Sequence, residues 1–269
     1  MYNISMENQK ELVIITGAAG HLGQTMIHAF GENYDLLLVD IDLRKLEKLN
    51  ELNHKRFSIL KVDITSTIDL AKLSSYIKAR GGFKYLIHLA RVGPEVLDIA
   101  SIYKVNLIGT RNLFNYLYPL IRPKGVMINI GASSSFLTPI PQMVFSLLSD
   151  PFNQKFLDNI TPLTPTPKDA YWWSRYAAAC LFKNDTMKWQ LKEARIVSIF
   201  PDIVEKSSLN LDPCEIKTSS TVSKEIFKED GTKLVELIRY IICEDNLHMS
   251  GINVIINEDG QISYFNDLK

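Results

Sequence analysis

Three glycines with a fixed spacing are the residues of this chain whose chemistry is easiest to name. Gly17, Gly20 and Gly23 stand at positions i, i+3 and i+6, directly after an apolar run at 12–15 and before a helical pattern at 25–30. A strand, a glycine turn and a helix together form a seat for a diphosphate, because glycines let the backbone approach the phosphates and the helix N-terminus offers N–H groups and a partial positive charge. A tight turn without a ligand is the alternative that the motif alone leaves open.

A carboxylate further along the chain favours a dinucleotide. A second apolar run, 36–39, ends in Asp40, which lies 23 residues after Gly17. A carboxylate at about that distance binds the adenosine ribose hydroxyls in sites of this type. A 2′-phosphate there would meet a like charge, at a cost of about 4 kcal/mol at 4 Å and an effective dielectric constant of 20. The sequence therefore favours NAD(H), while the nearby basic residues Arg44 and His21 keep NADP(H) open.

Composition narrows the classes of function. The chain has 269 residues, of which 46% are hydrophobic, enough for one substantial core. Its 30 basic and 30 acidic residues balance, which gives no sign of a nucleic-acid partner. Apolar runs stay short of the roughly 18 residues that a membrane span needs, and residues 1–10 lack the apolar core of a signal peptide. We therefore expect a cytoplasmic protein that has no membrane partner.

The cysteines and histidines are not spaced as metal ligands, so the sequence predicts no metal site. Cys180, Cys214 and Cys243 are odd in number and far apart. Cys180 and Cys243 fall in helical apolar patterns and are expected to be core thiols, which fits a reducing compartment. His88 lies inside an apolar run, and we expect it to be a buried residue with satisfied hydrogen bonds.

The order of apolar runs predicts the fold. Runs of strand character alternate with runs of helical periodicity, which implies a parallel sheet covered by helices on both faces. Expected strands are 12–15, 36–39, 57–63, 85–90, 126–130, 195–200 and 251–256, and expected helices are 43–49, 70–80, 100–120, 170–191 and 233–243. We predict an α/β fold of the Rossmann type, a doubly wound parallel sheet in three αβα layers, with residues 1–269 as a single domain.

Two stretches interrupt this alternation. Residues 136–170 hold six of the 11 prolines, which permit short helices at 142–148 and 151–159 but forbid one long element. Residues 207–230 are polar and rich in serine and threonine, so we expect a flexible loop that could include a short helix. Both segments are expected to flank the site and shape a substrate pocket.

These motifs resemble those of the short-chain dehydrogenase/reductase superfamily over nearly the whole chain. The glycine turn, the strand at 86–90 and the helix motif at 106–113 resemble the extended, epimerase-like branch. The closing strand within 250–260 and the insertion resemble the compact 3α-hydroxysteroid dehydrogenase/carbonyl reductase arrangement. The resemblance implies hydride transfer between a nicotinamide and a small or cyclic alcohol or ketone.

The resemblance also assigns contacts to the cofactor. It places Asp63 and Ile64 at the adenine edge, residues 89–91 along the ribose and diphosphate, and residues 201–204 at the nicotinamide carboxamide. One departure is Asp202, where the family has glycine. The full set of expected cofactor-binding residues is Gly17, Gly20, His21, Leu22, Gly23, Asp40, Ile41, Asp63, Ile64, Leu89, Ala90, Arg91, Tyr171, Arg175, Pro201, Ile203 and Val204.

The family's catalytic pair is Tyr-x-x-x-Lys, and the matching residues here are Tyr171 and Arg175. The i, i+4 spacing puts both side chains on one helix face. The phenol would donate or take the carbonyl proton, and because free tyrosine titrates near pH 10 it needs a cation beside it. Arginine supplies that charge and can bind the ribose, but it offers no titratable amine for a proton relay. If the two residues merely line a helix face, they have no catalytic role.

Two further residues complete the expected catalytic set. Gly131 and Ala132 stand where the family has serines, and three serines follow at 133–135. We choose Ser133 to bind the substrate oxygen, with a serine-rich turn of no catalytic role as the alternative. Asn106 matches the helix asparagine that kinks the backbone beside the catalytic cation.

The sequence leaves three functions open. The leading one is an NAD(H)-dependent oxidoreductase acting on a small-molecule substrate. A nucleotide-sugar epimerase or dehydratase is suggested by the N-terminal half, but the chain is short for a sugar-nucleotide lobe. A cofactor-binding sensor that has lost its chemistry is suggested by Arg175, Ala132 and Asp202. By resemblance, helices 100–120 and 170–191 would join subunits of a homodimer or homotetramer.

Overall fold

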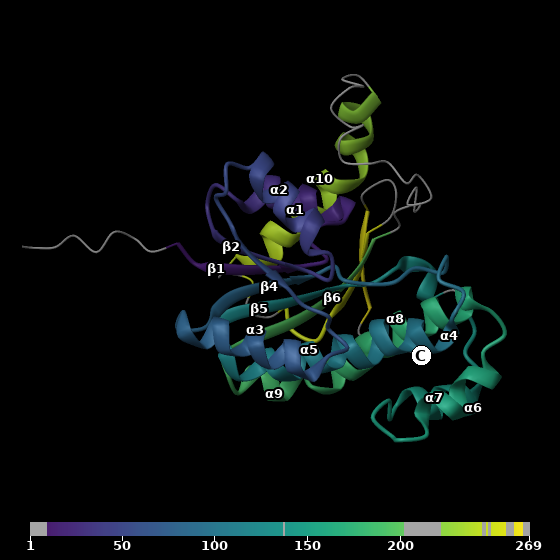
Figure 1. Cartoon of the computed structure of the whole chain (residues 1–269). Coiled ribbons are helices and arrows are strands. Elements are labelled where there is room, and N and C mark those ends of the chain that lie inside the picture. The colour runs from purple at the N-terminus through teal and green to yellow at the C-terminus, as the bar shows by residue number, and fades with distance from the viewer. Residues whose placement is uncertain are drawn as a thin grey trace, which may run out of the picture.

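A mostly parallel sheet forms the centre of the molecule (Figure 1). The structure is a computed structural model that describes residues 10–136, 138–201, 222–243, 246, 249–256 and 261–265. Within these residues the sheet has eight strands in the order β3-β2-β1-β4-β5-β6-β7-β8. The strands are β1 (Leu12–Thr16), β2 (Asp35–Asp40), β3 (Ser58–Lys61), β4 (Phe83–His88), β5 (Ile121–Ile130), β6 (Arg195–Pro201), β7 (Asn253–Ile256) and β8 (Ile262–Phe265). The predicted doubly wound α/β fold is confirmed.

Helices cover both faces of the sheet and make the three predicted layers (Figure 1). The first layer holds α1 (His21–Phe30), α2 (Leu43–Leu52) and α10 (Val222–Ile242). The opposite layer holds α3 (Thr67–Ala79), α4 (Ile99–Tyr103), α5 (Thr110–Leu117), α8 (Pro167–Asn184) and α9 (Thr186–Gln190). Each face has its own apolar core, since alternate residues of the buried strands point to opposite sides.

Short polar side chains start several helices. Asp42, Ser66 and Asp98 accept hydrogen bonds from backbone N–H groups in the first turns of α2, α3 and α4. Thr166 does the same for α8, with Pro167 at its first position. This capping explains why α8 begins three residues before the predicted start at 170.

The single helix predicted over 100–120 is in fact four consecutive pieces. Between α4 and α5 the chain makes a π-helical turn, Lys104–Gly109, and a 3-10 turn, Tyr118–Leu120, follows α5. The helix predicted over 170–191 is divided into α8 and α9. α10 begins inside the stretch 207–230, where a loop that could include a short helix was predicted, and continues through the helix predicted over 233–243.

The sheet also departs from the prediction at two of its strands. β5 begins at Ile121, five residues before the predicted start at 126, and includes Pro123 and Gly125; a register shift opposite Phe83 and Tyr85 accommodates them. β8 pairs antiparallel with β7 at the edge of an otherwise parallel sheet, and this strand was not predicted from the sequence.

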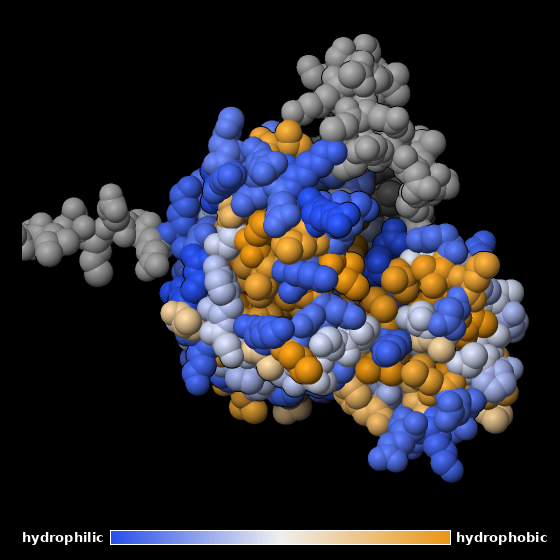
Figure 2. Space-filling view, in the orientation of Figure 1, coloured by the Kyte–Doolittle hydropathy of each residue, from blue (hydrophilic) through white to orange (hydrophobic). Residues whose placement is uncertain are grey.

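The proline-rich insertion packs on the outer side of α8. Its helices are α6 (Gln142–Leu148) and α7 (Phe156–Ile160), and the Trp173 indole N–H donates to the carbonyl of Pro139 at 3.2 Å. Leu148 and Phe156 are buried in the core of that face, whereas Met143 and Phe152 are exposed. Apolar side chains gather on the surface around α6 and α7 (Figure 2).

Two expectations about individual features have a structural outcome. Cys180 is half-buried and Cys243 is exposed, so the prediction that both are core thiols is wrong for Cys243; Cys214 lies outside the described residues. No helix in the described part of the chain combines the length and apolar character that crossing a bilayer would require.

Candidate functional site

The three glycines of the turn after β1 differ in what surrounds them. Gly17 has φ +68°, and a Cβ placed on it would lie 2.7 Å from the backbone nitrogen of Ala90. A Cβ on Gly23 would lie 2.4 Å from the carbonyl oxygen of Ala18. For Gly20 the nearest atom is 3.3 Å away, within its own turn. Gly17 and Gly23 are therefore required by the fold, whereas the space beside Gly20 is open enough for a ligand to approach the backbone.

The N-terminus of α1 faces this open side. Gly20 is its N-cap and has no side chain that could cap the helix, and the first intrahelical bond runs from Gln24 N–H to the Gly20 carbonyl at 3.1 Å. The N–H groups of His21, Leu22 and Gly23 therefore point out of the helix end. With the helix dipole these groups could hold an anion such as a diphosphate.

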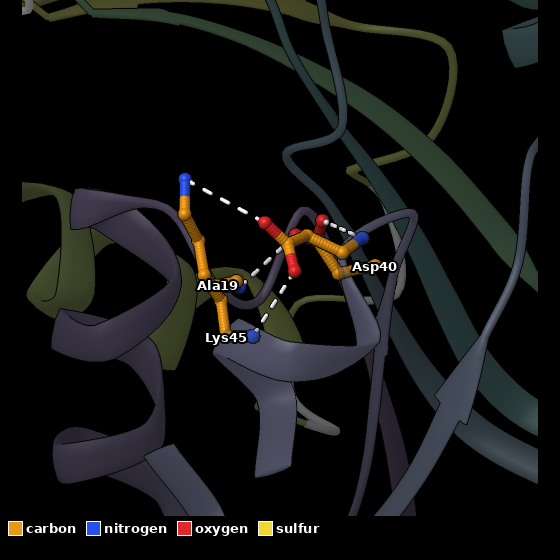
Figure 3. A network of polar contacts seen from close by, with 4 residues as sticks. Ala19, Asp40 and Lys45 are labelled. Atoms are coloured by element: carbon orange, nitrogen blue, oxygen red, sulfur yellow. Dashed lines mark hydrogen bonds and ion pairs between the residues drawn. The ribbon is translucent and has the colours of Figure 1, made fainter. Parts of the chain in front are cut away.

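Asp40 stands at the carboxyl end of β2 beside this turn (Figure 3). One carboxylate oxygen accepts from the Ala19 N–H and the other from the Asp42 N–H, both at 3.1 Å. These bonds fix the carboxylate, and each oxygen retains a lone pair for a ribose hydroxyl. Ile41, the residue after Asp40, is exposed. Asp42 caps α2, and its carboxylate lies 3.8 Å from the ammonium of Lys45.

The ends of β3 and β4 complete the expected cofactor side. The Asp63 carboxylate accepts from both the backbone and the hydroxyl of Thr65, at 2.8 and 2.7 Å. Ile64 packs against Gly109 of the π-turn, where an added Cβ would lie 3.0 Å from it. Leu89 is buried and Ala90 half-buried, directly after β4. All of these residues lie at the carboxyl edge of the sheet, where ligands bind in open α/β folds.

The π-helical turn presents Asn106 to the segment after β4. The Asn106 amide oxygen accepts from the Val92 N–H, and its amide nitrogen donates to the Val92 carbonyl, both at 2.9 Å. A π-turn is a wide, uncommon local conformation that is often found at functional sites. The structure thus places Asn106 at a backbone distortion, as the resemblance implied.

Tyr171 and Arg175 lie one turn apart on α8, with 2% and 1% of their surfaces exposed. The guanidinium of Arg91, which follows β4, lies 5.6 Å from the centre of the Tyr171 ring, within the range of a cation–π contact. The structure therefore brings the expected phenol and a cation from the cofactor-side segment into contact. The resemblance placed Arg91 along the ribose and diphosphate of the cofactor, and its contact with Tyr171 was not predicted from the sequence.

The serine-rich turn, Ser133–Phe136, follows β5 as a short 3-10 helix. A Cβ on Gly131 would lie 2.3 Å from the ring of Phe200, so Phe200 excludes the serine that the family has at this position. Ser135 is buried, whereas Ser133 is half-buried and thus more accessible to a substrate. Ser133 remains our choice, and the oxygen-binding role stays a prediction.

His88 is completely buried at the end of β4 between two threonines. Its Nδ1 lies 2.7 Å from the Thr16 hydroxyl and its Nε2 lies 2.9 Å from the Thr110 hydroxyl. Burial, together with the positive charge of Arg175, lowers the pKa of His88 to about 3, so the imidazole is neutral at physiological pH. The prediction that His88 is a satisfied core residue is confirmed, but sequence reasoning missed both threonine partners.

The structure describes most of the expected site residues and gathers them at one edge of the sheet. Pro201 ends β6 at this edge, whereas Asp202, Ile203 and Val204 lie outside the described residues. The individual cofactor and catalytic roles stay predictions.

Comparisons with known proteins agree with this geometry. A family model described as the NAD dependent epimerase/dehydratase family matches residues 13–153. An uncharacterised short-chain type dehydrogenase/reductase of Sinorhizobium fredii is 22% identical over 136 residues, which are 47% of this chain and 25% of that protein. The matched part of this chain thus spans about a quarter of the length of that curated relative.

Solved structures show the same fold. The 3α-hydroxysteroid dehydrogenase of Pseudomonas sp. B-0831, complexed with NADH, has a TM-score of 0.69 at 14% identity, covering 92% of this chain and 95% of that one. A glucose/ribitol dehydrogenase-type short-chain dehydrogenase/reductase of Brucella melitensis has a TM-score of 0.66 at 14% identity, covering 95% and 98%. Together with the family match, these similarities confirm the resemblance to the short-chain dehydrogenase/reductase superfamily.

Proposed function

The chain belongs to the NAD-dependent epimerase/dehydratase family, and on that premise we propose that it is an NAD(H)-dependent oxidoreductase of the short-chain dehydrogenase type. The observation that carries this proposal is the contrast among the glycines. The fold itself requires Gly17 and Gly23, whereas Gly20 leaves space at an uncapped helix N-terminus. A diphosphate fits that position by charge and by shape.

Asp40 supports NAD(H) as the preferred form of the cofactor. Its carboxylate is already oriented by the backbone N–H groups of Ala19 and Asp42, so binding ribose hydroxyls would need no rearrangement. A 2′-phosphate would instead approach a fixed negative charge.

The proposed chemistry is hydride transfer between the nicotinamide, which supplies or accepts the hydride when bound, and a small or cyclic alcohol or ketone. Tyr171 would donate or accept the proton on the substrate oxygen, and Ser133 would orient that oxygen. Arg175 would provide positive charge next to the phenol and bind the cofactor ribose. Asn106 holds the Val92 backbone and with it the segment that carries Arg91.

Titrations of purified protein with NADH and NADPH, followed by nucleotide fluorescence, test the cofactor part of the proposal. NADH is expected to bind more tightly. The absorbance at 340 nm with a panel of cyclic and aliphatic ketones tests the reaction. Tyr171→Phe should keep NADH binding and lower turnover by about 10²- to 10⁴-fold; full turnover in that variant would remove Tyr171 from the mechanism.

A second candidate function is favoured by the family match, which covers epimerases and dehydratases. A nucleotide-sugar epimerase would use the same cofactor seat and the same tyrosine. Conversion of a nucleotide sugar without net change in NADH would support it. Tight NADH binding without turnover of any ketone or sugar would instead support a cofactor sensor.

The subunit arrangement also belongs to the proposal. We expect a homodimer or homotetramer in the cytoplasm, joined through α4–α5 and α8–α9. Met187 in α9 and Leu191 directly after α9 are both exposed, as expected for an apolar contact with a second subunit. Light scattering of the purified protein measures the oligomeric state directly.

A further inference from the structure

The two hydrogen bonds of His88 belong to a longer chain with one consistent direction. The Ala90 N–H donates to the Thr16 hydroxyl at 3.5 Å, and the Thr110 hydroxyl donates to the Val105 carbonyl at 3.4 Å. The arrangement that gives both threonine protons and the imidazole N–H an acceptor has Thr110 donating to Val105 and accepting from Nε2 of His88. Nδ1 then has no proton and accepts from Thr16.

This direction requires the neutral imidazole with its proton on Nε2. In the opposite tautomer, with the proton on Nδ1, Thr110 would donate to Nε2 instead of to Val105. The Thr16 hydroxyl would then accept from Nδ1, and its own proton would have no acceptor among these hydrogen bonds. A protonated imidazole would donate at both nitrogens and so reverse the direction of the hydrogen bond with Thr16. Burial and the Arg175 charge, which lower the pKa of His88, keep the required neutral form.

Together with the backbone between the bonded residues, these bonds form a closed hydrogen-bonded ring that joins three parts of the proposed site. Thr16 directly precedes the glycine turn, Ala90 lies in the segment that touches Gly17, and Val105 directly precedes Asn106 in the π-turn. Asn106 returns to that same segment through its two bonds to Val92. The diphosphate seat and the π-turn are thus connected through one imidazole.

We propose that His88 is a positioning residue that holds the glycine turn, the segment at 89–92 and the π-turn carrying Asn106 in one relative position. This inference rests on the proposed function, since its consequence is a preformed cofactor seat. A shift of the segment by a few tenths of an ångström would reach the seat directly, because a Cβ on Gly17 would lie only 2.7 Å from Ala90.

Thr110→Val breaks the ring with little change of shape and touches none of the proposed catalytic residues. The matched control is Thr164→Val, because Thr164 is also a buried threonine with two bonds, to the Tyr103 hydroxyl at 3.0 Å and the Ile160 carbonyl at 2.9 Å. Thr110→Ser retains the hydroxyl and should behave as the unaltered protein.

Two measurements decide the proposal. Thr110→Val should raise the dissociation constant for NADH about fivefold, the effect of one lost neutral hydrogen bond, while Thr164→Val and Thr110→Ser stay within twofold. In the cofactor-free protein, Thr110→Val should accelerate amide exchange at Ala90, and nitrogen NMR of labelled histidine should find His88 protonated on Nε2 alone.

The two proposals fail in different ways. Equal effects of Thr110→Val and Thr164→Val on NADH binding and on Ala90 exchange would overturn the positioning role, as would a proton on Nδ1. Absence of NADH binding by the unaltered protein would overturn the proposed function. The amide-exchange and tautomer measurements would then test the positioning role of His88 without the cofactor.

Discussion

The stability of this protein should fall between pH 7 and pH 5 because of one residue, His88. Its pKa in the folded protein, about 3, lies below the value of 6.5 for a free imidazole. Between these two values the unfolded chain takes up a proton that the folded protein does not bind. Acidification therefore favours unfolding, and the stability present above about pH 6.5 is lost progressively as the pH falls toward 3.

The size of the effect follows from the two pKa values. Each pH unit well inside the window costs about 1.4 kcal/mol. Since the window opens gradually around pH 6.5, the loss between pH 7 and pH 5 amounts to about 2 kcal/mol. Most carboxylates titrate below pH 5, so this range isolates the imidazole. The other described histidines, His21, His28 and His54, are exposed in the folded protein.

Urea unfolding at pH 7, 6 and 5, followed by tryptophan fluorescence, measures the loss directly. The midpoint should fall with pH while the dependence on urea concentration stays constant. His88→Gln carries no titratable group, so its curve should lose the pH dependence even though its stability at pH 7 is lower. His28→Gln, at an exposed position, should retain the full dependence. Parallel curves for the unaltered protein and His88→Gln would show that His88 is not the source of the pH dependence.

Three further predictions concern the site. Gly23→Ala should lower the free energy of unfolding by about 1–3 kcal/mol, because its Cβ would press on the backbone, whereas Gly20→Ala should cost less than about 1 kcal/mol yet abolish NADH binding by titration. Asp40→Asn should raise NADPH affinity by tenfold or more, because the like charge that it removes costs up to about 4 kcal/mol, which corresponds to ~10³-fold; NADH affinity is the comparison. Arg175→Met should leave the thermal midpoint unchanged or raise it, while turnover at 340 nm is lost.

Local patterns in the sequence were sufficient to predict most of the fold. The strands β1, β2, β4 and β6 are buried apolar runs, and burial on both faces of a parallel sheet produces that signal. The antiparallel β8 was missed because its pairing depends on the free edge of β7, a feature of the assembled sheet that a short four-residue pattern does not encode. The early start of β5 was missed for a similar reason, since Pro123 and Gly125 normally end elements and only the register shift accommodates them.

The candidate site was predictable where a motif is contiguous and was not where contacts cross the fold. The glycine turn and Asp40 lie within one βαβ unit, so their proximity follows from chain order. The contact between Arg91 and Tyr171 joins residues 80 positions apart in the sequence. The hydrogen-bonded ring through His88 likewise depends on a distant residue, Thr110. Thr110 faces the imidazole because the π-turn sets the rotation of α5.

The burial of Arg175 bears on whether this chain has retained chemistry. Removing a guanidinium from water costs several kcal/mol, and an apolar side chain of similar volume is often as stable or more stable in such a position. The same charge also raises the cost of protonating His88. Position 175 is 1% exposed, so an apolar side chain would fill the space under α8 at a lower cost in stability than arginine does. The charge beside Tyr171 is therefore more readily explained by a bound ligand than by packing. A cofactor sensor would bind the nucleotide as well, so turnover by the unaltered protein is the measurement that separates an active oxidoreductase from a sensor.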